Sequence, residues 1–247
     1  MKDEGQSYSV ISTAYKCPRL YKLVHIDKIK TEQPASSALE FGSCFHAAIQ
    51  AILEGADGMD VFRTYWDSVK DKDMIYYRHN WDMLNEIGEV LLTRFARLHA
   101  KNYKIVHPME ERLFSKIGGY KLAGTPDFVG DYKGVPSIVD FKTSADAFVK
   151  DRIICNEQMP LYAYLAEKEL GFKAKQLVYQ VFTKQNPRIQ TIVHPIVEGE
   201  HQKMLDNITL MCETLDKATV FPMNRNSCLS AGRYKCQMWE QCYGEKK

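Results

Sequence analysis

The stretch GTPDFVGDYKGVPSIVDFKTS, residues 124–144, decides the fold, because it combines strand-forming runs with charged residues at fixed places. Asp127 follows a proline, Asp140 ends an apolar run, and Lys142 comes two positions later. Charged groups inside a folded chain are costly unless something pairs with them. The stretch therefore raises the question of what these two acids and one lysine bind.

Short runs rich in Val, Ile, Phe and Tyr alternate with turn signals over residues 112–142. A Gly-Gly pair at 118–119 and a Lys-Gly pair at 133–134 separate these runs, which predicts three antiparallel strands. We expect Asp127 in the second strand and Asp140 in the third. A hairpin then brings the two carboxylates side by side.

Residues two apart on a strand point to the same face, so Asp140 and Lys142 face one way, and Val139 and Phe141 face a core. Two close carboxylates repel unless a divalent cation neutralises both. Oxygen ligands without thiolates favour Mg²⁺ or Mn²⁺, and a lysine beside such a metal can stabilise charge on a phosphate. Each fragment alone is more typical of a surface ion pair or a turn.

The rest of the chain predicts an α/β or α+β domain. Apolar residues recur at intervals of three and four along 38–54, which predicts a helix. Helical periodicity also marks 60–72, 81–101, 156–170 and 198–217, whereas strands are expected in the segments that begin at Ala174 and at Arg188. Gly171 is expected to end the helix at 156–170.

Three further polar residues lie where they can face the acids. Gln158 and Tyr162 are four apart, so they share one face of the helix that follows the Asp140 strand. An ordinary amphipathic helix explains them equally well. His46 lies at the edge of the apolar stripe of helix 38–54, where a histidine is more often structural than a ligand.

Composition restricts the class of protein. The 247 residues are 45% hydrophobic and 26% charged, which is the ordinary globular range. The net charge of +2 permits a nucleic-acid partner without arguing for one. No apolar run approaches the roughly 18 residues of a membrane span. The start has no apolar signal segment, so we expect a reducing cytoplasm and no membrane partner.

Seven cysteines in a reducing compartment do not predict a disulfide framework. Cys44, Cys155 and Cys212 stand among apolar residues, and we expect them to be small buried side chains. The other four cysteines are Cys17, Cys228, Cys236 and Cys242.

These four thiols suit Zn²⁺ or an iron–sulfur cluster. Three of them lie within the last twenty residues, interleaved with aromatic residues, which favours an organised site over a disordered tail. They contain no C-x2-C pair of the kind found in zinc ribbons.

The ordered set of motifs resembles the RecB-type branch of the PD-(D/E)XK nuclease superfamily. The motifs are a G-x-x-x-H helix with His46, Pro126-Asp127, Asp140-Phe141-Lys142 and Gln158-x-x-x-Tyr162. The N-terminal segment SVISTAYKCPRLYKL and the cysteine-rich tail resemble the corresponding segments of the iron–sulfur members of this branch. These include AddAB-type helicase–nucleases, CRISPR-associated RecB-like exonucleases and phage exonucleases, and the resemblance runs from about residue 7 to residue 243.

The resemblance implies a restriction-endonuclease-like mixed central sheet flanked by helices. It implies one nuclease domain over 1–247, with a mainly helical part at 1–104, a catalytic sheet at 105–197 and a cysteine-rich tail at 198–247.

The resemblance also implies a role for each candidate residue. His46, Asp127, Asp140 and the Phe141 backbone carbonyl are expected to bind the metal, and Lys142 is expected to be the catalytic lysine. Gln158 and Tyr162 are expected to position the scissile strand or the lysine. An additional acid is expected before the strands, and Glu110 and Glu111 both remain open for it.

Cys17, Cys228, Cys236 and Cys242 are expected to bind one [4Fe–4S] cluster that ties the two ends of the chain together. The gap of seven residues between Cys228 and Cys236 is longer than in AddAB-type proteins, so Zn²⁺ remains the alternative.

The expected function is that of a Mg²⁺- or Mn²⁺-dependent deoxyribonuclease, an exonuclease that leaves 5′-phosphates. Single-stranded DNA or duplex ends are the expected substrate, and recombination or CRISPR-type proteins are expected partners, in the cytoplasm of a bacterium or a phage-infected cell. The alternatives are a DNA-end-binding module without catalysis, and a zinc-binding transcription-associated protein, which leaves the acids unexplained. The polarity of cleavage, and exonuclease against endonuclease action, stay open.

Overall fold

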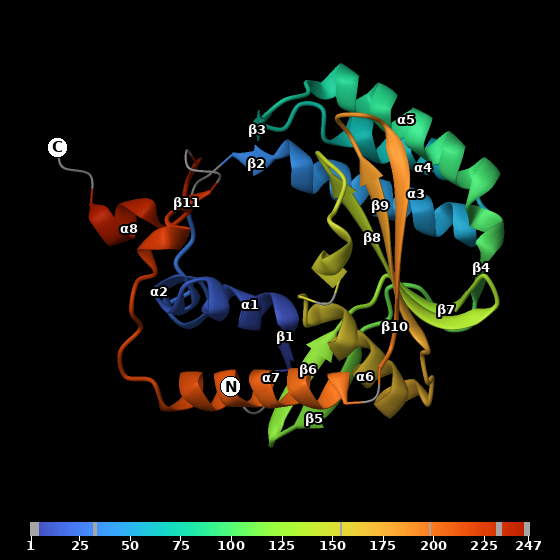
Figure 1. Cartoon of the computed structure of the whole chain (residues 1–247). Coiled ribbons are helices and arrows are strands. Elements are labelled where there is room, and N and C mark those ends of the chain that lie inside the picture. Colours follow the sequence, from blue (N-terminus) through green and yellow to red (C-terminus); the bar gives the residue numbers. More distant parts are fainter. Residues whose placement is uncertain (1–4, 32–33, 154, 198, 231–233, 245–247) are drawn as a thin grey trace. The chain divides into compact units, whose positions relative to one another are not determined.

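The computed structural model describes residues 5–31, 34–153, 155–197, 199–230 and 234–244. The chain forms two compact units, shown with their elements in Figure 1. The larger unit comprises Pro34–Leu113 and Thr125–Glu200, and the smaller unit comprises Met1–Gln33, Phe114–Gly124 and His201–Lys247. Among the described residues, no helix has both the length and the apolar character needed to cross a bilayer.

A five-stranded mixed sheet with helices on both faces forms the larger unit. Its elements are β2 (Ala35–Ser36), α3 (Ser37–Leu53), α4 (Gly58–Ser68), β3 (Met74–Ile75), α5 (Trp81–Leu98), β4 (Tyr103–Ile105), β7 (Phe128–Tyr132), β8 (Val135–Ser144), the 3₁₀ helix Lys150–Ile153, α6 (Gln158–Leu170), β9 (Gln176–Thr183) and β10 (Arg188–Pro195). This mixed α/β architecture confirms the predicted fold class.

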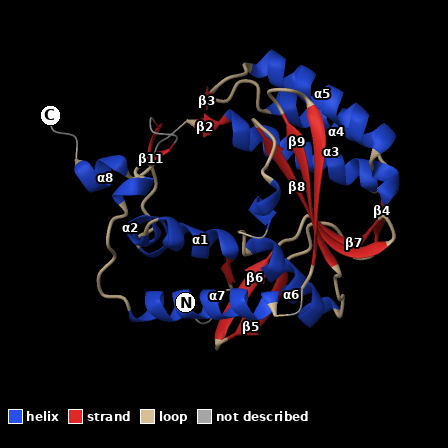
Figure 2. Cartoon of the chain, viewed as in Figure 1, coloured by secondary structure: helices blue, strands red, loops and turns tan. Residues whose placement is uncertain are grey.

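The strand order in this sheet is β10-β9-β8-β7-β4. Strands β7 and β8 form an antiparallel hairpin, and α6 provides the crossover that makes β8 and β9 parallel, as Figure 2 shows. Phe128 pairs with Val139 in the hairpin, so one further step along that register brings Asp127 beside Asp140. The sheet therefore brings the two acids together.

An aromatic core fills the space between one face of this sheet and the helices α3, α4 and α5 (Figure 1). Phe141 and Phe182 from the strands meet Phe45 of α3 and Phe95 of α5. Asp140 and its neighbour Ile138 point to the opposite face, because side chains alternate along a strand. Helix α6 contacts β8 and β9 there.

Two features differ from the sequence-based expectations. The second expected strand is two strands, β6 (Tyr120–Gly124) and β7, which lie in different sheets and are separated at Thr125–Asp127. Asp127 therefore lies in a bend directly before β7, and the prediction that it lies in a strand was wrong. Strand β4 was not expected, because its three residues directly follow a strongly helical pattern.

The smaller unit contains helices and short strands. Its elements are β1 (Gln6–Ser7), α1 (Tyr8–Lys16), α2 (Pro18–Tyr21), the π-helical turn Lys22–Ile26, β5 (Leu113–Ile117), β6, α7 (Glu200–Lys217), the 3₁₀ helix Arg225–Ser227, β11 (Leu229–Ser230), β12 (Tyr234–Lys235) and α8 (Trp239–Tyr243). Strand β6 lies between β1 and β5. Gly118 has φ 56°, and a β-carbon there would collide with Thr209 of α7, so the tight turn between β5 and β6 requires glycine.

Gly88→Ala should destabilise the larger unit although alanine is the better helix former. A β-carbon at Gly88 of α5 would meet the buried ring of Phe62, with Cε1 only 2.7 Å away. We expect a loss of about 1–3 kcal/mol in the free energy of unfolding, measured by chemical denaturation. Gly42→Ala in α3 is the matched control, because its only near neighbour is Thr143 Oγ1 at 3.5 Å. That substitution should be neutral or stabilising by up to about 1 kcal/mol, and equal effects at both glycines would contradict this packing.

Candidate active site

Two carboxylates are held close together where the β7–β8 hairpin meets the preceding bend. Asp140 lies within β8 and is only 1% exposed. The Phe141 backbone N–H donates to Asp127 Oδ2 over 2.7 Å, which fixes the Asp127 side chain against β8. Lys142 Nζ lies 2.8 Å from both Oδ1 and Oδ2 of Asp140. The hairpin thus presents two acids and one ammonium group together.

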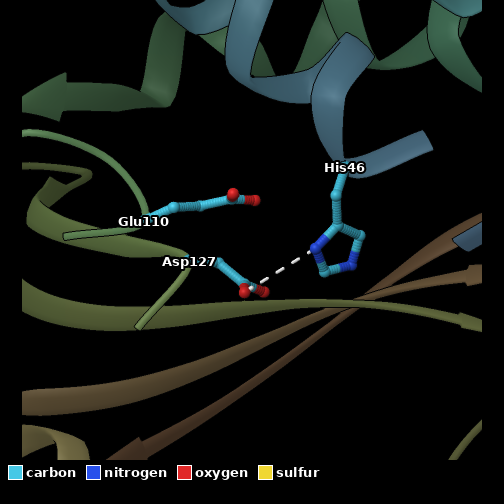
Figure 3. A group of neighbouring side chains, drawn as sticks. All are labelled: His46, Glu110 and Asp127. Atoms are coloured by element: carbon cyan, nitrogen blue, oxygen red, sulfur yellow. Dashed lines mark ion pairs between the residues drawn. The ribbon is translucent and has the colours of Figure 1, made fainter. Parts of the chain in front are cut away.

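Figure 3 shows a second set of side chains around Asp127. His46 projects from α3, Glu110 from the loop after β4, and their ligand atoms and that of Asp127 all lie within 4.8 Å of one another. His46 Nδ1 lies 3.7 Å from Asp127 Oδ1. One imidazole nitrogen and two carboxylates without a thiolate are a donor set that suits Mg²⁺ or Mn²⁺.

Glu110 has a strained backbone that aims its carboxylate into this set. Its φ is 53°, in the left-handed region that side chains other than Gly, Asn and Asp rarely adopt. Such strain costs of order 1–3 kcal/mol and concentrates at functional sites. Both Glu110 and Glu111 are exposed, but only Glu110 belongs to the group, which makes it the better candidate for the additional acid.

The two oxygen atoms of Asp140 differ in their hydrogen bonding. Both lie 2.8 Å from the Lys142 ammonium, but only Oδ1 accepts a hydrogen bond from it, and Oδ2 is buried with this ion pair alone. A buried carboxylate oxygen that accepts no hydrogen bond is costly, and a divalent cation would compensate for it. The residues present therefore fit a bound divalent cation, although Asp140 is not part of the His46–Glu110–Asp127 group.

Burial and nearby charges shift the pKa values of Asp127, Asp140 and Lys142. Burial, and then the Asp140 charge, raise the pKa of Asp127 to about 7. Burial likewise raises the pKa of Asp140. For Lys142, burial disfavours the ammonium, but the attraction of Asp140 and Asp127 outweighs it and raises the Lys142 pKa. The lysine therefore stays protonated, and the acids resist full ionisation without a cation.

Gln158 and Tyr162 lie together on α6, beneath β8. Gln158 Nε2 donates to the Tyr162 hydroxyl over 2.8 Å, and Asn156 Oδ1 accepts from the Gln158 backbone N–H. Tyr162 is 7% exposed, and burial and then the nearby Asp140 charge raise its pKa. The hydroxyl therefore remains a neutral donor within electrostatic range of the acids.

Sequence reasoning missed Arg152, on the 3₁₀ helix after β8. Its guanidinium lies over the Phe148 ring, 4.0 Å from the centroid. Spacing gives no signal for such a residue, since a lone arginine in a polar stretch is typical of an exposed surface.

The smaller unit brings together the four cysteines Cys17, Cys228, Cys236 and Cys242, which line one small cavity of about 10 Å³. Leu20, Leu23 and Met238 pack around Cys17. The Asn224 N–H donates to Cys17 Sγ over 3.3 Å, and the Tyr243 hydroxyl donates to Cys228 Sγ over 3.4 Å. Hydrogen bonds to sulfur from such donors suit thiolates that bind a metal group.

The spacing of these sulfur atoms bears on the kind of group they can hold. In the described part of the chain, no three of them lie within 4.8 Å of one another. Four thiolates on one tetrahedral zinc ion would be roughly 3.8 Å apart, given Zn–S bonds of about 2.3 Å. As they lie in the described residues, no three of the sulfur atoms are therefore close enough to share one zinc ion.

The three remaining cysteines behave differently from one another. Cys44 and Cys212 are buried, as predicted, and burial raises the pKa of the Cys44 thiol to about 12 and that of Cys212 to about 11. Cys155 is exposed, so its predicted burial was wrong. It follows the 3₁₀ helix on the surface, where neighbouring apolar residues in the sequence do not enclose it.

The model of the PD-(D/E)XK nuclease superfamily matches residues 6–243. A search of curated proteins finds no match. Among solved structures, a candidate exonuclease from Eubacterium rectale is 15% identical and has a TM-score of 0.59, with 89% of this chain and 84% of that chain covered. The protein SSO0001 is 14% identical over 84% of both chains, with a TM-score of 0.33. Rai1 from Scheffersomyces stipitis is 12% identical over 84% of this chain and 67% of that one, with a TM-score of 0.27.

Asp127→Asn should stabilise the metal-free protein while it removes metal binding. Asparagine can still accept from the Phe141 N–H, but the repulsion with Asp140 disappears. We expect the melting temperature in EDTA to rise by about 2–4 °C, as a gain of about 1 kcal/mol gives for a chain of this size. The rise in melting temperature that Mn²⁺ causes in the wild-type protein should be lost.

Glu111→Gln is the control for this substitution, because it also removes one acid near the site but lies outside the ligand group. It should keep the full Mn²⁺-induced rise, measured by scanning calorimetry. A full Mn²⁺ response in Asp127→Asn would show that this carboxylate does not bind the metal.

Proposed function

Since the chain belongs to the PD-(D/E)XK nuclease superfamily, we propose that it is a Mg²⁺- or Mn²⁺-dependent deoxyribonuclease that acts as an exonuclease and leaves 5′-phosphates. One observation carries the proposal: two adjacent carboxylates, Asp127 and Asp140, are held together beside a protonated lysine, and one of their buried oxygen atoms accepts no hydrogen bond. The two carboxylates need a cation to balance their charge, and the ammonium group can bind an anionic substrate.

His46, Asp127, Asp140 and the Phe141 carbonyl would hold the catalytic cation, with Glu110 as the additional acid. The cation would supply Lewis-acid polarisation of the scissile phosphate and a nucleophile at neutral pH. The peptide unit of Phe141 serves twice in this proposal, because its N–H orients Asp127. The chain thereby sets the ligand positions before the cation or the substrate arrives.

Lys142 stabilises the negative charge that develops on the phosphate in the transition state. Asp140 orients the ammonium, since both of its oxygens lie 2.8 Å from Nζ. A preorganised cation in a water-poor site is worth far more than one in water. Gln158 and Tyr162 act as positioning residues, because their mutual hydrogen bond fixes a neutral donor beside Asp140.

The substrate in this proposal is single-stranded DNA or a duplex end, and proteins of recombination or CRISPR-type systems are proposed partners. The four thiols are proposed to hold one [4Fe–4S] cluster. Its function would be structural, since Cys17 and the three other cysteines come from opposite ends of the sequence but line one cavity. Closing so long a loop removes conformational entropy from the unfolded chain.

The nuclease proposal is tested with end-labelled linear DNA and covalently closed circular DNA in Mg²⁺ or Mn²⁺. The wild-type protein should degrade the linear DNA, spare the circle and release products with 5′-phosphates. Lys142→Ala should bind DNA with near wild-type affinity but cleave it about 10²–10³-fold more slowly, since one preorganised donor to developing charge is lost.

Lys101→Ala is the control, because Lys101 is an exposed lysine of the same unit. It should cleave at the wild-type rate. DNA binding by the wild-type protein without cleavage under any of these conditions would favour a binding module that keeps the nuclease fold. If Lys142→Ala lost DNA affinity and cleavage rate by the same factor, Lys142 would contact a phosphate without stabilising the transition state.

Protein purified without oxygen should be brown and contain about four irons per chain. Serine in place of any one of Cys17, Cys228, Cys236 or Cys242 should bleach the protein and lower its melting temperature. Serine in place of Cys44 or Cys212 is the control and should leave the colour unchanged. A colourless protein with one zinc per chain would reject the cluster and retain the four-thiol site, whereas a metal-free and equally stable protein would reject both.

A further inference from the structure

Lys184, directly after β9, is a buried lysine whose charge no described carboxylate neutralises. Of the acidic and basic side chains that the structure describes, only Asp140 and Lys184 are buried, and Lys184 is 8% exposed. Asp140 pairs with Lys142, whereas the Lys184 Nζ lies over the Phe41 ring of α3, 5.1 Å from its centroid. A buried charge that nothing neutralises is costly, so a lysine in this place indicates an anionic ligand from outside the chain.

The Lys184 ammonium group can still be reached from outside. Nζ makes no hydrogen bond within the described chain, yet it is not one of the fully buried nitrogen and oxygen atoms that lack a partner. The apolar stem is therefore enclosed while the charged tip keeps contact with solvent, which is the usual arrangement of a partly buried lysine. A ligand can meet the tip without unfolding the core.

The backbone that carries Lys184 is fixed where the parallel strands β8 and β9 end. The Lys184 N–H donates to the Ser144 carbonyl over 2.8 Å, and the Gln185 N–H donates to the Ala145 carbonyl over 3.0 Å. Ser144 is the last residue of β8, and Thr183 is the last residue of β9. Ligands of sheets with parallel strands usually bind beyond the carboxyl ends of those strands. Lys184 thus lies at an edge suited to a ligand.

A second cation is tied to the same turn between β9 and β10. Arg78, in the loop between β3 and α5, donates from Nη1 to Gln185 Oε1 over 2.7 Å, and the same nitrogen lies 3.8 Å from Asp146 Oδ2. Arg78 and Asp146 are both exposed, so water screens their attraction. Burial, and then the charges of Lys184 and Arg78, lower the pKa of His79. The turn therefore gathers two cations and only one screened carboxylate.

We propose that Lys184 and Arg78 bind a phosphate group of the DNA strand, at a site separate from the catalytic centre. This inference rests on the proposed nuclease function and adds a second phosphate contact to it. Lys142 pairs in register with Val181, and Lys184 comes three residues later, roughly 10 Å along the strands. Lys184 also lies on the face that meets α3, opposite Lys142, so the two lysines contact different phosphates. The contact carries no sequence information, because it involves only the backbone of the DNA.

Lys184→Met separates a role in binding from a role in the fold, because methionine keeps an apolar stem and removes the charge. The melting temperature should rise by about 2–4 °C, since an unpaired buried charge is lost. Affinity for a fluorescent single-stranded oligonucleotide in EDTA, measured by anisotropy, should fall about fivefold or more at low salt. The slope of log affinity against log salt should decrease by about 0.7, the value for one phosphate of a single strand. A lysine with a purely structural role would change the melting temperature alone.

Arg78→Gln should also weaken binding and decrease the salt slope. It should not raise the melting temperature, because the Arg78 side chain is exposed and its charge is already solvated. Lys101→Met is the matched control, because Lys101 is an exposed lysine of the same unit, directly before β4 at the far edge of the sheet from β10. It should leave the affinity, the salt slope and the melting temperature close to wild type.

Wild-type affinity and salt slope in Lys184→Met would overturn the proposal, as would an equal loss of affinity in Lys101→Met. Inorganic phosphate tests for a different source of the same group. If phosphate raised the wild-type melting temperature and Lys184→Met abolished that rise while DNA affinity stayed unchanged, the site would bind a free phosphate compound, and its assignment to DNA would be wrong. If the wild-type protein cleaves DNA in either case, the nuclease function stands without this contact, whereas no binding and no cleavage by the wild type would remove both.

Discussion

The enforced closeness of Asp127 and Asp140 is the constraint on which the rest of the larger unit depends. The β7–β8 register brings the acids together, and one backbone N–H, that of Phe141, prevents Asp127 from turning away. Burial raises the pKa of both groups, and the Asp140 charge raises that of Asp127 further, so holding both acids ionised destabilises the free protein. The aromatic core on the other face of β8 offsets this cost, because Phe141 anchors the same strand among fully buried rings. The strand that carries Asp140 is thus also anchored in the aromatic core.

Much of this arrangement could be predicted from the sequence because it depends on local periodicity. The helix expected at 38–54 is Ser37–Leu53, and Gly171 ends α6 in the left-handed conformation that glycine favours. Alternation along a strand is equally local, so Asp140 and Lys142 had to share a face. The contact between Gln158 and Tyr162 follows from a four-residue helical spacing in the same way. The superfamily was predicted from the order of such motifs, and the family match over residues 6–243 confirms it.

The remaining features depend on contacts between distant segments, which periodicity does not encode. The break between β6 and β7 arises because consecutive strands join different sheets, and nothing in GTPDF separates a bend from a continuous strand. Glu110 is distinguished from Glu111 by one unusual backbone angle, which only the folded loop imposes. Burial of Cys155 was predicted from its apolar neighbours in sequence, but the packing of the loop leaves it exposed. The clamp of the Gln190 side chain on the Phe148 backbone joins residues 42 positions apart, and no local pattern predicts it.

The smaller unit is assembled from three separate pieces of sequence, and this has a consequence for biosynthesis. The larger unit is complete once Glu200 has left the ribosome, whereas the smaller one still lacks its last piece. Cys17 and Asn224, which are in contact in the folded chain, are 207 positions apart. The segment that carries Cys17 is therefore made before the larger unit but packed after it, against the usual order in which domains fold as they emerge. During that interval Cys17 has no surrounding cavity, and its thiol is open to oxidants that the finished protein excludes.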